Sequence, residues 1–99
     1  MTIVAVRCEG SRPDGWTCTV ALRDGSVDIS THRVRVRPDD LERLAPAAVD
    51  PVALVEQSFR FLLDRESPQM ILAAFDLLEI GRYFPEYEAE IRRRMRGLG

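Results

Sequence analysis

The sequence predicts an α+β fold, with strands in the first third of the chain and helices in the rest. Residues 1–37 contain short runs in which apolar and polar side chains alternate, which is the period of a strand. Residues 39–96 carry helix-start signals and apolar side chains at helical spacing. Because the strands come first and the helices follow, we expect an antiparallel meander of three or four strands, with four to five short helices packed on one face of the sheet.

The first two strands are expected on either side of a turn. Thr2–Cys8 is a β-rich run, and residues 16–22 alternate between apolar side chains and Thr or Ala. Between them, residues 12–15 read Arg-Pro-Asp-Gly, which favours a turn because Pro fixes φ and Gly accepts a positive φ. Asp24-Gly25 then predicts a tight hairpin into the next strand.

The third run contains an irregularity. Val27 and Ile29 continue the hairpin, and residues 33–37 alternate strictly as Arg-Val-Arg-Val-Arg. The apolar parity changes between Ile29 and Val34, so we expect a bulge or break within residues 30–32.

Four helix starts can be recognised after Pro38. Asp39 with Glu42 has the spacing of a capping box, and Asp50-Pro51 reads as an N-cap followed by Pro in the first turn. Ser67-Pro68 repeats this signal, so that Ile71, Leu72 and Phe75 are expected to face inward from a helix. Asp76 with Glu79 is a second capping-box spacing.

The last helix follows Pro85. Tyr87, Ile91 and Met95 lie at i, i+4 and i+8, which predicts one buried stripe. We therefore expect a single domain over residues 1–99, with the meander in residues 1–37 and the helical half in residues 39–96. Ninety-nine residues leave no room for a second core.

The charge of the chain is small in total and uneven in distribution. The net charge is −2, and all 14 basic residues are Arg, a bias that fits a GC-rich bacterial genome. Residues 1–38 hold six Arg and four acidic residues, residues 39–90 hold four Arg and twelve acidic residues, and residues 91–99 hold four Arg. The balances of +2, −8 and +4 describe a bipolar molecule with no overall bias toward nucleic acid or membranes.

Cysteine use and hydropathy favour a cytoplasmic protein. Cys8 and Cys18 are too few for a disulfide framework. Symmetric pairing of the first hairpin would make them diagonal neighbours, able to form a disulfide only under oxidising conditions. No run approaches the roughly 18 apolar residues of a membrane span, and the first ten residues contain Arg7 and Glu9 rather than the apolar core of a secretory leader.

One part of the helical half resembles a known group of proteins. Residues 58–66 read Ser-Phe-Arg-Phe-Leu-Leu-Asp-Arg-Glu, and they are followed by Phe75-Asp76-Leu77 and by Tyr-Phe-Pro-Glu-Tyr at residues 83–87. This pattern resembles small bacterial proteins of unknown function, about a hundred residues long, that share a helical half after a variable β-rich start. The resemblance covers about residues 50–90. It implies a shared fold and carries over no activity and no catalytic residue.

The sequence offers little for catalysis or metal binding. His32 is the only histidine, so nucleophilic catalysis would have to use it, but no Ser or Cys lies in a strained elbow or Gly-rich frame. A surface histidine at a strand break is the simpler interpretation. Cys8, Cys18 and His32 lack the paired spacing of a zinc site. We expect no catalytic set, no metal and no cofactor.

The acidic and aromatic residues have structural explanations. Asp39, Glu42, Asp50, Asp76 and Glu79 fit helix starts, so capping explains them without acid–base chemistry. No glycine-rich phosphate loop is present. The phenylalanines have the spacing of core residues, whereas Trp16, Tyr83 and Tyr87 could line a surface groove.

Two groups of arginines remain as candidate contact residues. One group shares a strand face, and the other crowds the last helix; together they are Arg33, Arg35, Arg37, Arg92, Arg93, Arg94 and Arg96. They could contact nucleic-acid phosphates. Alternatively, the strand group blunts an exposed sheet edge, while the helical group complements the helix dipole and pairs as Glu88–Arg92 and Glu90–Arg94.

These observations favour a non-enzymatic protein-interaction or adaptor domain. The bipolar charge suits a protein partner or a second copy of the chain, and we expect no membrane partner. An RNA- or DNA-binding module that uses the arginines is the first alternative, and a small enzyme that uses His32 is the second.

Overall fold

The first three strands form the antiparallel meander that the sequence predicts. The computed structural model describes residues 1–98, and in it each strand pairs with the next one along the chain. These strands are β1 (Thr2–Ser11), β2 (Gly15–Asp24) and β3 (Val27–Val36). The α+β prediction is therefore confirmed.

A fourth strand joins the sheet from the helical half, where a helix was expected. The Ser67-Pro68 signal starts only one 3-10 turn, η1 (Pro68–Met70), and the chain then extends into β4 (Ala74–Asp76), parallel to β3. The backbone N–H of Arg33 donates to the carbonyl of Ala73 at 2.8 Å. This pairing occupies backbone groups on the edge of β3 that a helix would leave unsatisfied. Extended backbone also turns Leu72 outward, contrary to the prediction, and its side chain is 51% exposed.

The irregularity in β3 lies one residue earlier than expected. Leu22 pairs with Ser30 and Arg23 pairs with Asp28, so Ile29 is the extra residue of a bulge. The bulge restores the parity that buries His32, Val34 and Val36 together on one face.

The helices follow in the expected order, with two of the starts shifted. They are α1 (Pro38–Leu44), α2 (Val52–Leu63), the 3-10 turn η2 (Leu77–Glu79), α3 (Ile80–Tyr83) and α4 (Tyr87–Leu98). The capping box predicted for Asp39 and Glu42 is wrong. Helix α1 already begins at Pro38, so Asp40 occupies its third position and accepts the backbone N–H of Arg37 at 3.0 Å.

The other two acidic caps are found where the sequence places them. The Asp50 carboxylate accepts the backbone N–H of Val52 at 2.9 Å, although α2 begins one residue later than predicted. The backbone N–H of Asp76 donates to the Glu79 carboxylate at 2.7 Å, so the second capping-box prediction is confirmed.

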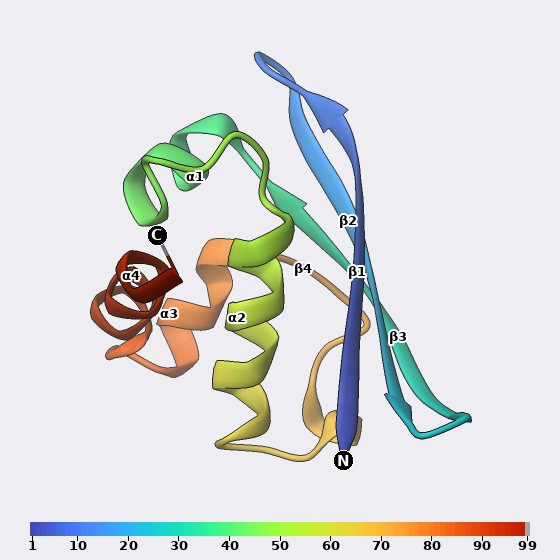
Figure 1. Cartoon of the computed structure of the whole chain (residues 1–99). Helices are drawn as coiled ribbons and strands as arrows, with labels where there is room; N and C mark the ends of the chain where they lie inside the picture. The colour runs from blue at the N-terminus through green and yellow to red at the C-terminus, as the bar shows by residue number, and fades with distance from the viewer. Residues whose placement is uncertain (99) are drawn as a thin grey trace.

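Helix α2 is the centre of the core. It lies between the sheet and α4, and the helices cover only one face of the sheet (Figure 1). Leu54, Val55, Phe59 and Phe61 on this helix are completely buried. They pack in one cluster with the inward residues of β2 and β3 and with Tyr87 and Ile91 of α4.

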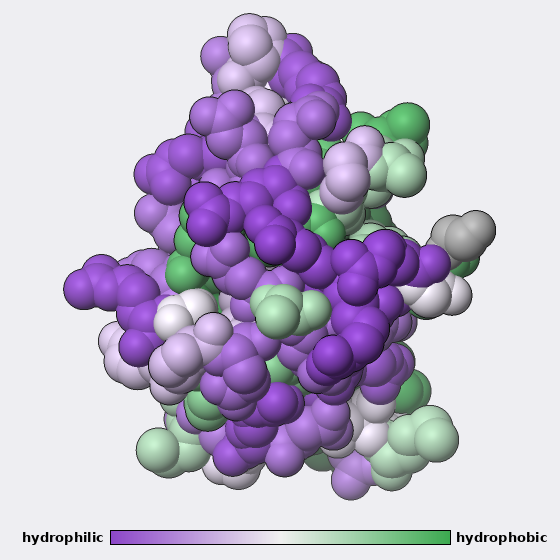
Figure 2. Space-filling view, turned by 90° about the vertical axis from the view of Figure 1, so that its left-hand side faces the viewer, coloured by the Kyte–Doolittle hydropathy of each residue, from purple (hydrophilic) through white to green (hydrophobic). Residues whose placement is uncertain are grey.

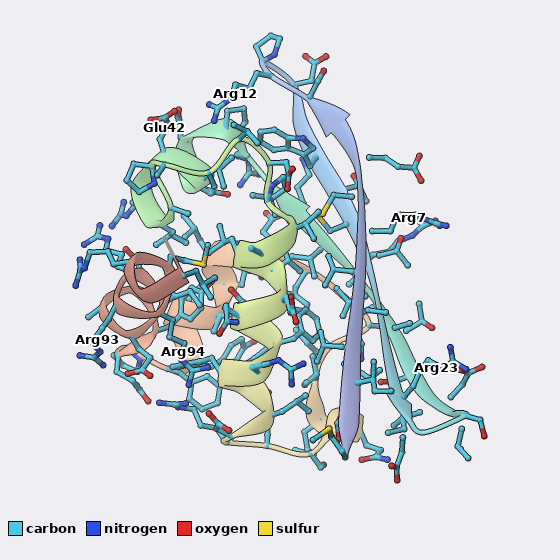
Figure 3. The ribbon with its side chains drawn as sticks, viewed as in Figure 1. Arg7, Arg12, Arg23, Glu42, Arg93 and Arg94 are labelled. Atoms are coloured by element: carbon cyan, nitrogen blue, oxygen red, sulfur yellow. A yellow bond between two sulfur atoms is a disulfide. The ribbon has the colours of Figure 1, made fainter. Side chains whose placement is uncertain are left out.

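Within residues 1–98, no helix lies over the opposite face of the sheet. Residues that alternate with the core positions point outward there, among them Ile3, Arg7, Thr17 and Arg33. Arg7 and Arg23 extend away from the helical layer (Figure 3). Strand β1 is one edge of the sheet along its ten residues, whereas at the other edge the three-residue β4 pairs only with Arg33–Arg35 of β3.

One polar contact joins the two central helices inside the core. The Ser58 hydroxyl donates to the carbonyl of Leu54 and lies 2.7 Å from the Tyr87 hydroxyl, both at full burial. Burial raises the pKa of Tyr87, so the phenol stays neutral and can donate to Ser58.

We expect this contact to be energetically coupled. Ser58→Ala leaves the Tyr87 hydroxyl buried without a partner and should lower the free energy of unfolding by about 1–3 kcal/mol, whereas Tyr87→Phe should cost only about 1 kcal/mol. The double variant should cost less than the sum of the two, as measured by urea unfolding. A double variant that costs the full sum would contradict a direct interaction.

A disulfide joins β1 to β2. Cys8 and Cys18 are directly opposite each other rather than diagonal, and they are bonded, with a sequence separation of ten. Cys18 is completely buried, so the bond lies on the helical side of the sheet.

Reduction of this disulfide should destabilise the fold. Release of a loop of about ten residues is expected to remove about 2–3 kcal/mol of the free energy of unfolding by the chain-entropy estimate. Thermal unfolding with and without a reductant measures the effect, and a Cys8→Ala/Cys18→Ala variant should be insensitive to the reductant. Equal stability of the oxidised and reduced wild type would contradict this expectation.

Candidate functional site

His32 is buried and fully engaged rather than at the surface. Its side chain lies on the helical side of β3 with 3% exposure, because the bulge at Ile29 sets its parity. Nδ1 lies 2.7 Å from the carbonyl oxygen of Leu72, and Nε2 lies 2.8 Å from the Ser30 hydroxyl. The ring also packs 5.4 Å from that of Phe59. Both ring nitrogens thus have hydrogen-bond partners within the protein. Through its contact with Leu72, His32 attaches the segment before β4 to the sheet.

The three residues considered for a zinc site are all bonded to other protein groups. Cys8 and Cys18 are oxidised to the disulfide, and His32 uses its two nitrogens on Leu72 and Ser30. Within residues 1–98, no group of three or more His, Cys, Asp or Glu side chains could hold a metal ion.

The two arginine groups lie on different sides of the molecule. Arg33 and Arg35 point away from the helices, on the uncovered face of β3, and α4 lies in the helical layer on the other side of the sheet (Figure 1). β3 is an interior strand between β2 and β4, so its arginines do not blunt an edge as one interpretation proposed. The structure does not bring the two groups together.

Five of these seven arginines already donate to protein acceptors. Arg35 donates to the carbonyl of Asp14, and the Arg37 guanidinium lies 3.3 Å from the Asp76 carboxylate. The acceptors of the other three are the carbonyl of Arg43 for Arg92, Glu90 for Arg93, and both Glu90 and Asp64 for Arg94. Of the pairs predicted within α4, Glu90–Arg94 is present at 3.1 Å. Glu88 is bound by Arg43 instead.

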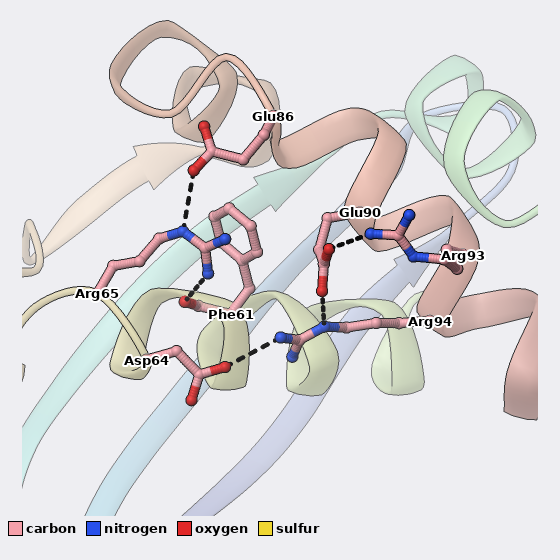
Figure 4. A network of polar contacts seen from close by, with 7 residues as sticks. All are labelled: Phe61, Asp64, Arg65, Glu86, Glu90, Arg93 and Arg94. Atoms are coloured by element: carbon pink, nitrogen blue, oxygen red, sulfur yellow. Dashed lines mark hydrogen bonds and ion pairs between the residues drawn. The ribbon is translucent and has the colours of Figure 1, made fainter.

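A polar network fastens α4 to the end of α2 (Figure 4). Arg94 contacts the Glu90 carboxylate at 3.1 Å and the Asp64 carboxylate at 3.0 Å, so it bridges the two helices. Arg65 donates to Glu86 and to the carbonyl of Phe61, each at 3.1 Å. Its guanidinium also lies 3.6 Å from the centre of the Phe61 ring, within the range of a cation–π contact.

An apolar groove opens beside this network, between the end of α2, the segment around η1 and β4, and α3. Its volume is about 430 Å³. Leu62, Ile71, Phe75, Ile80 and Phe84 form much of its lining.

The rim of this groove, which we call the acidic groove, combines exposed apolar side chains with carboxylates. Met70, Leu72 and Tyr83 line the groove and are 68%, 51% and 69% exposed. Glu66 and Glu79 contribute the only charged side chains to the described lining. Of the aromatic residues that the sequence suggested for a groove, Tyr83 is placed here, whereas Trp16 and Tyr87 are buried in the core. Met70 and Leu72 are not recognised as groove residues from the sequence, because the pattern predicts a helix there that turns Leu72 inward.

A second hollow lies between α1, α2 and the end of α4, with a volume of about 440 Å³. Its floor is mostly alanine and leucine, and its charged lining residues are Arg43, Arg92 and Arg96. Arg43 already donates to the Glu88 carboxylate, and Arg92 already donates to the backbone carbonyl of Arg43. The two hollows therefore differ in the sign of the charge at their rims.

The surface outside the grooves is polar on the helical side. Figure 2 shows mainly hydrophilic residues over the helices, with small, separated apolar spots. Among residues 1–98, no helix is long and apolar enough to cross a membrane.

Comparisons with known proteins add no assignment. No protein-family model, curated protein or solved structure matches the chain. The resemblance of residues 50–90 to small bacterial proteins therefore remains a prediction.

The α2–α4 network predicts a specific loss of stability in acid. Hydrogen bonds from Arg94 and Arg93 lower the pKa of Glu90 from 4.5. A carboxylate with a lowered pKa in the folded state stabilises the protein above its unfolded pKa, and this contribution is lost as the pH falls through the folded pKa. Glu90→Gln should therefore lower the urea midpoint at neutral pH, and the two proteins should converge at a pH below the folded pKa of Glu90. Asp14→Asn, at an exposed carboxylate that forms no ion pair within residues 1–98, serves as the control. A Glu90→Gln effect that is the same at both pH values would contradict this role.

Proposed function

We propose that this chain is a non-enzymatic protein-interaction domain, and that its acidic groove binds an apolar peptide segment carrying a basic residue. The observation that carries the proposal is the pairing of three exposed apolar side chains, Met70, Leu72 and Tyr83, with an apolar hollow of about 430 Å³. Exposed apolar surface of this kind, bordered by polar residues, marks interaction sites.

The shape of the apolar surface favours a peptide over a small molecule. The rim side chains extend the apolar surface beyond the hollow, so an occupant that fills only the hollow would leave them in water. A peptide can insert one apolar side chain into the hollow and cover Leu72 and Tyr83 with its neighbours. Burial of such side chains contributes roughly 25 cal/mol per Å² of apolar surface before the costs of ordering are counted.

The charge of the groove indicates the sign of the partner. Glu66 and Glu79 lie in the lining, and residues 39–90 carry a net charge of −8. Lys or Arg beside the apolar anchor would be attracted by this potential, which also disfavours acidic segments.

Other features support this function over the alternatives. Both nitrogens of His32 are bound to protein groups inside the core, which argues against its use as a general base. Five of the seven candidate arginines hold protein acceptors, which argues against a phosphate-binding surface made of them. The cytoplasmic location remains a prediction, and the Cys8–Cys18 disulfide favours an oxidising compartment instead.

Selection from a phage-displayed random-peptide library tests the groove. We expect enriched peptides to combine a large apolar residue with a nearby Lys or Arg. Synthetic copies should shift the NMR signals of Leu72 and Tyr83 and should bind more weakly as the salt concentration rises. Leu72→Ser should weaken binding about tenfold, which corresponds to about 1.4 kcal/mol.

The matched control is Val49→Ser. Val49 is 85% exposed and lies outside the lining of the acidic groove, so the substitution removes an exposed apolar side chain without altering the site. Unchanged peptide affinity in both Leu72→Ser and Tyr83→Ser would refute the groove, and enrichment of acidic peptides would refute the charge argument.

A further inference from the structure

The two edges of the sheet are protected to different degrees. On one side the three-residue β4 pairs with Arg33–Arg35 of β3, and the chain then turns into η2. On the other side β1 forms an edge ten residues long that contains no proline and no lysine. A long edge strand presents unpaired backbone N–H and C=O groups that can pair with another strand, and proteins usually block such edges.

The backbone groups that face this free edge can be assigned. The Cα atoms of Cys8 and Cys18 are 4.0 Å apart, which is nearer to the separation of about 4.5 Å of an antiparallel pair that is not hydrogen-bonded to each other than to the separation of about 5.5 Å of a hydrogen-bonded pair. The N–H and C=O of Cys8 therefore point away from β2, and by the period of two so do those of Val4 and Val6. These groups form a row along the open edge.

The outward side chains of β1 carry one positive and one negative charge two residues apart. Arg7 and Glu9 are both exposed on the uncovered sheet face. Neither forms an ion pair within residues 1–98. Across β2 they stand opposite Thr19 and Thr17. The fold of one copy thus leaves both charges without a countercharge.

We propose that β1 pairs with β1 of a second copy, antiparallel about a twofold axis at Cys8, to form a continuous eight-stranded sheet. In this register Arg7 of each copy lies opposite Glu9 of the other, so one dimer contains two such pairs. The neighbouring registers are worse, because they place Arg7 opposite Arg7, or Glu9 opposite Glu9. Cys8 would pair with Cys8 through the outward backbone groups, and Val6 would lie opposite Gly10.

The pairing geometry favours the two charge contacts. Residues next to a hydrogen-bonded pair occupy the closely spaced, non-hydrogen-bonded positions, where side chains approach most closely. Opposite charges directly across such a pair stabilise a sheet, and like charges destabilise it. The proposal uses a different surface from the acidic groove, so either one can fail without the other.

Charge exchange tests the dimer. Sedimentation velocity over a range of concentrations should show a reversible dimer of the wild type. Arg7→Glu and Glu9→Arg should each raise the dissociation constant about tenfold or more, because each change creates two like-charge contacts. The double variant restores both contacts with the signs reversed, so its dissociation constant should return to within about threefold of the wild type.

The controls separate this interface from general charge effects. Arg33→Glu makes the same change of charge on the uncovered face of β3, an interior strand, and should leave the dissociation constant unchanged. All variants should keep the wild-type far-UV spectrum and thermal midpoint at monomeric concentrations. Leu72→Ser should leave dimerisation intact, and the β1 variants should leave peptide binding intact.

A direct measurement checks the register. In a sample that mixes labelled and unlabelled protein, NMR should detect an intermolecular contact between the Hα atoms of Arg7 and Glu9. A wild type that stays monomeric at millimolar concentration would overturn the proposal. So would a double variant as weak as the two single variants combined, or an intermolecular contact in another register.

Discussion

The structure depends on the packing of α2 against the inner face of the sheet. The apolar face of the four-stranded sheet is unfavourable when it is exposed to water. Helix α2 supplies the apolar surface that covers this face. Phe59 illustrates the dependence, since its completely buried ring contacts both His32 of β3 and Phe75 of the segment that follows α2. On its far side, α2 also holds α4 through Ser58 and Tyr87. The helix is therefore shared by both layers, and the surfaces available for function are those that it leaves uncovered.

Those surfaces are the acidic groove and the outer side of the sheet. The groove lies where the chain follows α2 with η1 and an extended segment, between the end of α2 and α3. His32 fixes the position of this segment by its contact with the carbonyl of Leu72. His32, which is buried in the core, thus positions the segment beside the groove.

The sequence predicts the secondary-structure elements better than it predicts the tertiary contacts between them. Alternation within residues 1–37 and the cap at Asp76 define strands and a helix start correctly, because these signals are local. The expected helix after Ser67-Pro68 failed, because the unpaired edge of β3 offered hydrogen bonds that only the fold creates. His32 was misplaced for a similar reason, since a single extra residue at Ile29 decides the side of the sheet on which it lies. Spacing predicts the Glu90–Arg94 pair within α4, whereas the Arg94 contact to Asp64 joins residues 30 positions apart, so spacing could not reveal it.

The small size of β4 has a consequence for how many copies can assemble. In the proposed dimer, strand pairing at β1 uses one edge of each sheet, and at the other edge β4 occupies the Arg33–Arg35 segment of β3, which disfavours further strand addition there. If β4 detached from β3, each copy would expose two long edges, and addition of copies could continue without limit into a filament. The contact between His32 and the Leu72 carbonyl, which holds the approach to β4 in place, would then act as a terminator of polymer growth.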